Sequence, residues 1–176
     1  DGDFGAELEE YRSRLWKRHF VARVVAFPGV AALFREIRRY GKRIAVASSA
    51  KEDEVVHYLD LCGIGTLVDV RTSADDAARS KPHLDLFRAA MAELKVDDPE
   101  RACAVGDTPW DAISAARAGL QTIGMLTGGW EAAMLRRAGC FAIYVDPEDL
   151  LRRYDDSPLH RPEMYRQGRP LAELVP

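Results

Sequence analysis

The chain has 176 residues, of which 47% are hydrophobic and 30% charged, so its composition predicts one soluble globular domain and excludes a disordered chain. The formal net charge of -3 gives no electrostatic reason to expect a nucleic-acid partner. No apolar run approaches the length of a membrane span and the acidic N-terminus does not resemble a signal peptide, so we expect no membrane partner and a cytoplasmic location. Cys62, Cys103 and Cys140 lie in apolar surroundings, which favours reduced thiols over disulfides or a zinc site.

The N-terminal part of the chain has the pattern of two helices joined by an extended run. Residues 6–19 have helical periodicity, with Leu8 and Leu15 near one face. An apolar run over residues 21–27 predicts an extended segment. A second helical stripe then covers residues 30–40.

From residue 43 onward, short apolar runs alternate with helices of about three turns. The expected strands cover residues 43–47, 67–70, 102–105, 122–126 and 142–145. The expected helices cover residues 52–62, 84–94, 110–118, 131–138 and 147–154. This alternation indicates right-handed βαβ units, so the predicted fold class is α/β, a Rossmann-like parallel sheet with helices on both faces.

Polar side chains follow two of the predicted strands. Ser48 and Ser49 come directly after one strand, Asp107 follows another, and Lys81 opens a helix between them. The carboxyl ends of parallel strands meet at one edge of a sheet, where ligands bind next to helix N-termini. We therefore expect hydroxyl groups, an ammonium group and the carboxylates of Asp107 and Asp111 to converge on one crevice.

Each of these residues also has an ordinary structural interpretation. Ser48 or Ser49 could cap the helix that follows, as most serines in that position do. Thr108 as the N-cap residue, with Asp111 in the first turn, would form an ordinary helix start. Lys81 taken alone would be a solvated surface lysine. The residues taken singly therefore do not decide between the two interpretations.

Their order along the chain closely resembles motifs two, three and four of the haloacid dehalogenase superfamily. These motifs are Ser48 after a strand, Lys81-Pro82, and Gly106-Asp107-Thr108-Pro109-Trp110-Asp111. Flanking segments match as well: Phe27-Pro28-Gly29-Val30, His83-Leu84-Asp85-Leu86-Phe87 and Ala115-Ala116-Arg117-Ala118-Gly119. The resemblance covers roughly residues 6–155 and is strongest to the phosphoglycolate-phosphatase-like branch, so a haloacid-dehalogenase-like core is expected.

The resemblance implies a magnesium-dependent hydrolase of small phosphate monoesters that works through an aspartyl-phosphate intermediate. Magnesium prefers hard oxygen ligands, which Asp107 and Asp111 supply. By resemblance, Ser48 hydrogen-bonds a phosphoryl oxygen, Lys81 balances the charge of the nucleophile and phosphate, and Ser49 is a further substrate-binding candidate. The expected partner is a small phosphorylated metabolite, and the protein is expected to be a monomer or homodimer.

The family's reaction also needs an aspartate nucleophile, followed two residues later by a second aspartate that acts as general acid and base, at the end of the first strand. The apolar run over residues 21–27 ends without a carboxylate. Asp1-Gly2-Asp3 has the required spacing, but no apolar strand precedes it. We therefore expect the nucleophile upstream of residue 1, on a strand that lies between those ending at Ala47 and Val105.

The predicted organisation is the remnant of a helical cap with its return linker over residues 1–26, a core domain over residues 27–155 and a C-terminal extension over residues 156–176. Gly128-Gly129-Trp130 is expected to shape the loop after a strand. A non-catalytic phosphate-binding pseudoenzyme remains open, as do a sugar-phosphate mutase, a phosphonatase and a dehalogenase. A phospho-receiver domain is disfavoured, because its acidic cluster comes before its hydroxyl and lysine residues.

Overall fold

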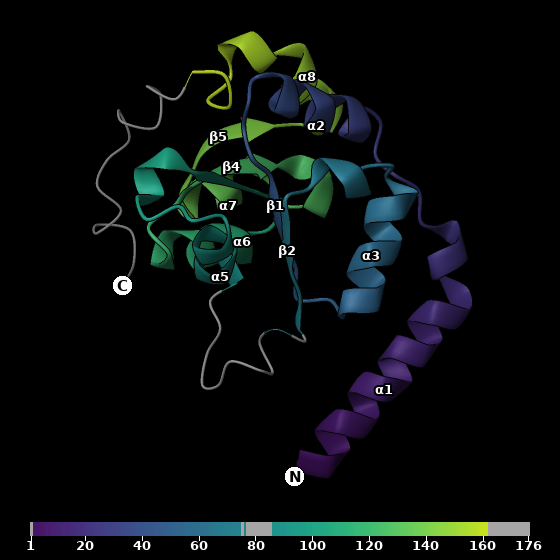
Figure 1. Ribbon diagram of the computed structural model, residues 1–176. Helices are drawn as coiled ribbons and strands as arrows, with labels where there is room; N and C mark the ends of the chain where they lie inside the picture. The colour runs from purple at the N-terminus through teal and green to yellow at the C-terminus, as the bar shows by residue number, and fades with distance from the viewer. Residues whose placement is uncertain (1, 75, 77–85, 162–176) are drawn as a thin grey trace.

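The computed structural model describes residues 2–74, 76 and 86–161, and in these parts of the chain short parallel strands alternate with helices (Figure 1). The strands are β1 (Ala45–Ala47), β2 (Val70–Thr72), β3 (Cys103–Gly106), β4 (Gln121–Met125) and β5 (Cys140–Tyr144). The α-helices are α1 (Gly2–His19), α2 (Val30–Arg39), α3 (Glu52–Leu61), α5 (Leu86–Glu93), α6 (Pro109–Arg117), α7 (Ala132–Arg137) and α8 (Pro147–Arg152). The 3-10 helices are η1 (Val21–Arg23), η2 (Gly65–Leu67), η3 (Pro99–Arg101), η4 (Leu126–Gly128) and η5 (Tyr154–Asp156).

The strands form two parallel sheets. β1 pairs with β2, and β3, β4 and β5 form the second sheet in that order. The predicted α/β class with parallel strands is confirmed. Among the described residues, neither β1 nor β3 pairs with a strand along its other edge. The sheets therefore separate between the two strands that were predicted to flank the nucleophile's strand.

Helices cover both faces of the sheet formed by β3, β4 and β5 (Figure 1). On one face, Leu33 of α2 and Leu150 of α8 share a buried cluster with Ile123 of β4. On the other face, Leu135 of α7 packs against Cys140 of β5. Almost the whole of β4 is buried, as expected for a central parallel strand with helices on both sides.

Helix α5 contacts both sheets. It lies against β1 and β2. Its Phe87 and Met91 also pack against a buried cluster that contains Ala104 of β3 and Ala115 of α6. The apolar face of α5 therefore joins the two sheets into one core, although no described strand bridges them.

Two predicted extended segments differ in the structure. Residues 21–27 begin with the 3-10 turn η1 and then form no strand. The strand predicted over residues 67–70 is shifted and begins at Val70. The shift arises because Leu67 ends the turn η2, where its N–H donates to the Ile64 carbonyl at 2.9 Å. Local turn formation therefore takes precedence over β propensity at both places.

The start of the predicted C-terminal extension belongs to the core. Ser157 is fully buried, and its hydroxyl donates to the Tyr154 carbonyl at 2.7 Å. Leu159 is buried in the same cluster as Leu33 and Tyr154. The core therefore continues to residue 159, beyond the predicted boundary at 156, because an apolar residue among prolines finds a place against α2 and η5.

Helix α1 extends away from the sheets (Figure 1). Leu8 and Leu15, which the helical pattern placed near one face, are 56% and 39% exposed. Near the end of α1, the Trp16 indole N–H donates to the Tyr58 hydroxyl at 2.9 Å, and the Trp16 ring stacks on Phe20. The apolar face of α1 is therefore largely uncovered by the described residues.

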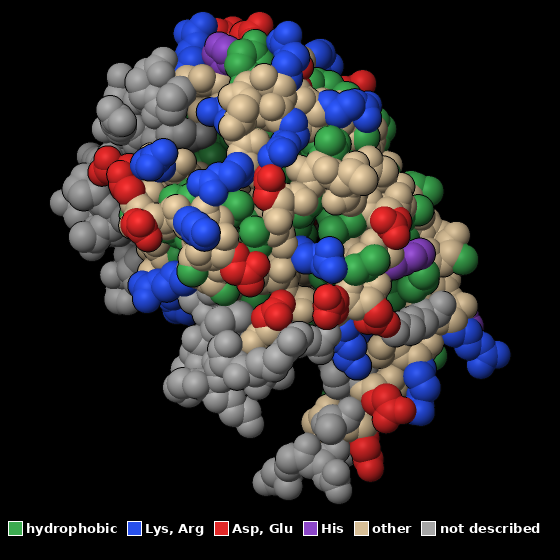
Figure 2. All heavy atoms as spheres, viewed as in Figure 1, with side chains coloured by type: hydrophobic (Ala, Val, Ile, Leu, Met, Phe, Trp, Pro, Cys, Tyr) green, Lys and Arg blue, Asp and Glu red, His purple; other side chains and the backbone are tan. Residues whose placement is uncertain are grey.

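Charged side chains of both signs are interspersed over the face shown in Figure 2. This mixture agrees with the alternation of Arg and Asp or Glu along the sequence. None of the helices described by the structure is both long and apolar enough to cross a bilayer.

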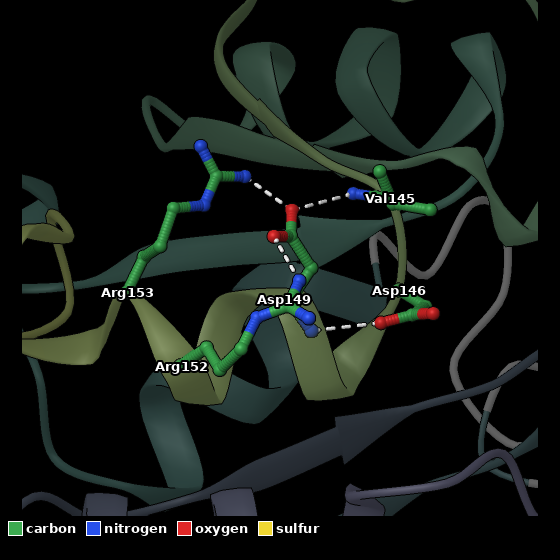
Figure 3. Close-up of polar contacts among 5 residues, drawn as sticks. All are labelled: Val145, Asp146, Asp149, Arg152 and Arg153. Carbon is green, nitrogen blue, oxygen red and sulfur yellow. Dashed lines mark hydrogen bonds and ion pairs between the residues drawn. The ribbon is translucent and has the colours of Figure 1, made fainter.

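The first turn of helix α8 contains a buried carboxylate, that of Asp149 (Figure 3). Asp149 Oδ2 accepts the Val145 N–H at 3.1 Å, and the Asp146 side chain accepts the Asp149 N–H at 2.8 Å. Arg152 and Arg153 both pair with the Asp149 carboxylate. Burial opposes ionisation of Asp149, but these donors outweigh it and hold its pKa below the ordinary value.

We expect Asp149→Asn to lower the free energy of unfolding at pH 7 by about 1–2 kcal/mol, because two ion pairs are lost while an oxygen remains for the Val145 N–H. A carboxyl with a lowered pKa stabilises the fold above its unfolded pKa of about 3.9 and loses this effect as the pH falls through the folded value. Urea unfolding should therefore show a difference from wild type that shrinks below about pH 4. Asp97→Asn, at an exposed position, is the control and should change little. A difference that does not depend on pH would contradict this account.

Candidate functional site

The turn from β3 into α6 is organised around one oxygen atom of Asp111. Its Oδ2 accepts the N–H of Asp107 at 3.1 Å, the N–H of Thr108 at 2.9 Å and the hydroxyl of Thr108 at 2.9 Å. Thr108 is the N-cap residue, and its side chain accepts the Asp111 N–H at 3.2 Å in a reciprocal capping box. The interpretation of Thr108 and Asp111 as an ordinary helix start therefore describes their geometry correctly.

Gly106 is needed for this turn because of a close approach. A Cβ atom at Gly106 would lie 2.4 Å from the Cβ of Asp111, well inside van der Waals contact. The absence of a side chain at Gly106 lets the capping carboxylate fold back onto the end of β3. Asp107 is consequently the first residue after the carboxyl end of a parallel strand, where ligands bind in α/β sheets.

The same backbone arrangement recurs at the turn from β5 into α8. Asp146, like Thr108, is an N-cap residue followed by proline, and Asp149 accepts the N–H four residues earlier, as Asp111 does. The two turns differ in charge, because Asp149 is paired with two arginines. Within the residues that the structure describes, Asp111 has no such ion pair. The capping geometry is therefore shared, and an acidic turn without a paired cation is particular to β3–α6.

Asp107 also has contacts from the loop after the neighbouring strand β4. The Thr127 hydroxyl donates to Asp107 Oδ2 at 3.1 Å. A Cβ atom at Gly128 would lie 2.2 Å from the Asp107 carbonyl oxygen, so the backbone of η4 lies directly against this residue. Gly128 was expected to shape a loop, whereas Thr127 was not among the predicted site residues. The one sequence feature that could have pointed to Thr127 is that it follows a predicted strand, as Asp107 does.

Ser48 occupies on β1 the position that Asp107 occupies on β3, directly after the carboxyl end of the strand. Its N–H donates to the Thr72 carbonyl at 3.0 Å, which continues the β1–β2 ladder. Its Oγ accepts the Ala50 N–H at 3.1 Å. Helix α3 has Lys51 as its N-cap residue, so the capping role considered for Ser48 and Ser49 is wrong. The Ser48 hydroxyl is half-buried, and no described residue accepts its hydrogen, which can therefore be donated to a ligand.

Of the remaining predicted site residues, only some lie within the part of the chain that the structure describes. Ser49 is exposed. Lys81 lies outside the described residues, as does Asp1. Residues Gly2 to His19 form α1, so the backbone of Asp3 lies in a helix and not at the end of a strand, where the nucleophile of this family is expected.

The described part of the chain contains no group of three or more His, Cys, Asp or Glu residues that could hold a metal ion. The carboxylates of Asp107 and Asp111 are hard oxygen donors of the kind that magnesium prefers, and both are only partly buried. Burial, and then the negative charge of Asp111, raise the pKa of the Cys140 thiol to about 11, so this thiol is protonated at neutral pH. The residues present therefore fit part of a magnesium site and leave further ligands to other groups.

Comparison with curated proteins gives relatives that are phosphatases. A probable phosphatase, IndB of Dickeya dadantii, is 33% identical over 104 residues, which cover 59% of this chain and 45% of IndB. A phosphoglycolate phosphatase of Cupriavidus necator is 33% identical over 94 residues, which cover 53% of this chain and 40% of the relative. The chain thus spans about half the length of the curated relatives it matches.

Solved structures show the same fold. A hydrolase from Pseudomonas syringae has a TM-score of 0.74 and 25% identity, covering 85% of this chain and 68% of that protein. CbbY from Rhodobacter sphaeroides, in complex with xylulose-1,5-bisphosphate, has a TM-score of 0.57 and 32% identity, covering 70% and 55%. Residues 4–119 match the family described as haloacid dehalogenase-like hydrolase. The chain therefore belongs to the haloacid dehalogenase-like hydrolase family, as predicted.

Proposed function

We propose that this chain forms the greater part of the core of a magnesium-dependent phosphohydrolase that cleaves small phosphate monoesters through an aspartyl-phosphate intermediate. The observation that carries the proposal is the position of Asp107, directly after a parallel strand, in a turn held by Asp111 and without a paired cation among the described residues. The similarity of the chain to phosphatases of this family supports the same assignment.

Asp107 is the proposed metal ligand. Its Oδ2 already accepts the Thr127 hydroxyl, and Oδ1 is the oxygen left for a cation. Asp111 uses Oδ2 to hold the turn, so its proposed contribution to the metal site is the field of its charge and its second oxygen, Oδ1. Bound magnesium would neutralise the charge that develops on the transferring phosphoryl oxygens.

Ser48 and Lys81 are the proposed phosphate-binding side chains. Ser48 Oγ accepts the Ala50 N–H, which orients the hydroxyl and leaves its hydrogen to donate to a phosphoryl oxygen. Lys81 is proposed to balance the combined charge of nucleophile and phosphate, and Ser49 to contribute through its exposed position beside Ser48.

The nucleophile is proposed to come from a strand inserted between β1 and β3. In the described residues each of these strands has a partner on one edge only, and a strand added there would satisfy the backbone groups of both free edges. Its carboxyl end would place an aspartate between Ser48 and Asp107. Residues 1–26 are then the end of a helical cap, which would cover the apolar face that α1 exposes.

The proposed substrate is a small phosphorylated metabolite. CbbY, one of the similar proteins, was crystallised with xylulose-1,5-bisphosphate, a small phosphorylated sugar. A sugar-phosphate mutase uses the same phosphoryl-transfer site, and the substrate-binding part of the cap decides between the two. A monomeric or dimeric state and a cytoplasmic location stay predictions.

We expect full-length protein to hydrolyse para-nitrophenyl phosphate in the presence of magnesium, and Asp107→Asn to lower kcat at least about 100-fold, because it removes a metal ligand worth several kcal/mol in the transition state. Lys81→Ala and Ser48→Ala should lower kcat/KM by about 10²–10³-fold each through lost contacts to phosphoryl oxygens. Asp97→Asn, exposed on the loop after α5, is the matched control. Activity that survives Asp107→Asn and Lys81→Ala would refute the site assignment.

The aspartyl-phosphate intermediate predicts a second result. Acid quenching during turnover, followed by peptide mass spectrometry, should find the phosphoryl group on an aspartate of an Asp-x-Asp sequence upstream of residue 1. Phosphate trapped on Asp107, or a burst of product with no labelled aspartate, would contradict the proposed strand between β1 and β3. A native reading frame that begins at Asp1 would do the same and would favour a pseudoenzyme.

A further inference from the structure

Two separate contacts fix Asp107, one on its backbone and one on its side chain. The backbone N–H is bound by Asp111 Oδ2, which belongs to the same turn. The carboxylate is bound by the Thr127 hydroxyl, which comes from η4, after the neighbouring strand. The hydrogen bond from Asp111 therefore fixes the backbone position of Asp107, but it does not fix the direction in which the Asp107 carboxylate points.

A carboxylate on the surface of a turn rotates about two side-chain torsions, and this freedom is lost when it binds a cation. A donor that already holds one carboxylate oxygen reduces this entropic cost and leaves the other oxygen to face the ligand. Partners of this kind orient metal ligands in many sites, and their removal typically weakens metal binding about 10–100-fold.

The loop that carries Thr127 is held tightly against Asp107. The Gly128 backbone approaches so closely that a Cβ atom there would lie 2.2 Å from the Asp107 carbonyl oxygen and 3.0 Å from its Cγ. β3 and β4 pair in register, with Gly106 opposite Gly124, so the loops that leave both strands start at the same level. The Thr127 hydroxyl therefore approaches Asp107 from a loop whose backbone packs directly against the same residue.

We propose that Thr127 is a positioning residue that orients the Asp107 carboxylate for binding magnesium. The hydroxyl of Thr127 donates to Oδ2, which would leave Oδ1 as the oxygen that holds the cation. This inference rests on the proposed function, since it takes Asp107 as the metal ligand.

The experiment measures magnesium affinity by isothermal titration calorimetry on the full-length protein, with the magnesium-induced rise in Tm as a second readout. Thr127→Val keeps the shape of the side chain and removes the donor, and we expect it to weaken magnesium binding about tenfold or more. Thr127→Ser keeps a hydroxyl that can donate to Asp107, so this variant should bind magnesium about as tightly as wild type.

The chain offers a matched control in Thr122 on β4. Its hydroxyl is buried and has no hydrogen-bond partner among the described residues. Thr122→Val therefore makes the same chemical change on the strand that leads to Thr127, at a residue that forms no hydrogen bond with Asp107 within the described part of the chain. Magnesium affinity of Thr122→Val should equal that of wild type. A loss in both valine variants would mean that packing of β4, and not the Thr127 hydroxyl, is responsible, and it would overturn the inference.

Asp107→Asn separates this inference from the proposed function. If Asp107→Asn abolishes magnesium binding while Thr127→Val binds like wild type, the inference is wrong and the proposed function stands. If Asp107→Asn binds magnesium like wild type, the proposed metal site itself is wrong. Equal weakening in Thr127→Val and Thr127→Ser would also overturn the inference, because a retained hydroxyl should restore binding.

Discussion

Three hydrogen atoms point at a single oxygen, Asp111 Oδ2, and the candidate site depends on this contact. By accepting the N–H groups of Asp107 and Thr108, the carboxylate satisfies the backbone donors of the two residues that come immediately before α6. It also forces β3 to turn into α6 directly after Gly106, where a side chain would collide with Asp111. Asp107 is therefore presented at the end of β3 by hydrogen bonds between residues close in the sequence.

The molecule contains this turn twice, once between β3 and α6 and once between β5 and α8. The two copies share their backbone hydrogen bonds and differ in the charges around the aspartate. At both strand ends an N-cap residue is followed by proline and, two residues later, by an aspartate that binds back to the strand. Asp149 is neutralised by Arg152 and Arg153, which lowers its pKa and makes it part of the fold (Figure 3). The acidic turn at β3–α6 has Thr127 as a neutral donor to Asp107 and no ion pair on Asp111 among the described residues. A negative charge that the described residues do not neutralise is available to a cation.

The separation of the two sheets also bears on the candidate site, because within the described residues it leaves free strand edges there. Strand edges present unpaired N–H and C=O groups, which soluble proteins usually pair or cover. β1 and β3 each pair on one edge only within the described residues, while α5 packs across both sheets and holds them in one core. Ser48 and Asp107 come directly after these two strands. The unpaired edges and the proposed catalytic residues therefore belong to the same two strands, which is the arrangement that an inserted nucleophile strand requires.

Most of the fold could be read from the sequence, because hydrophobic periodicity and turn residues are local. The strand–helix alternation, the helix start at Thr108 and Asp111, and the positions of Ser48 and Asp107 at strand ends all follow from a few neighbouring residues. The same local information left two roles open for Ser48 and Asp111. The structure rejects a capping role for Ser48, because Lys51 is the N-cap residue of α3. It supports a capping role for Asp111, which takes part in the capping box of α6.

What the sequence by itself determined is the class of fold, the family and the residues at the two strand ends. Tertiary structure alone decided the burial of Ser157 and Leu159, the exposure of α1 and the contact between Thr127 and Asp107. These two residues are 20 positions apart, and they meet only because β3 and β4 pair in parallel and in register. Periodicity describes which face of an element is apolar, whereas such a contact depends on which element lies beside it, and that is set by packing of the whole chain.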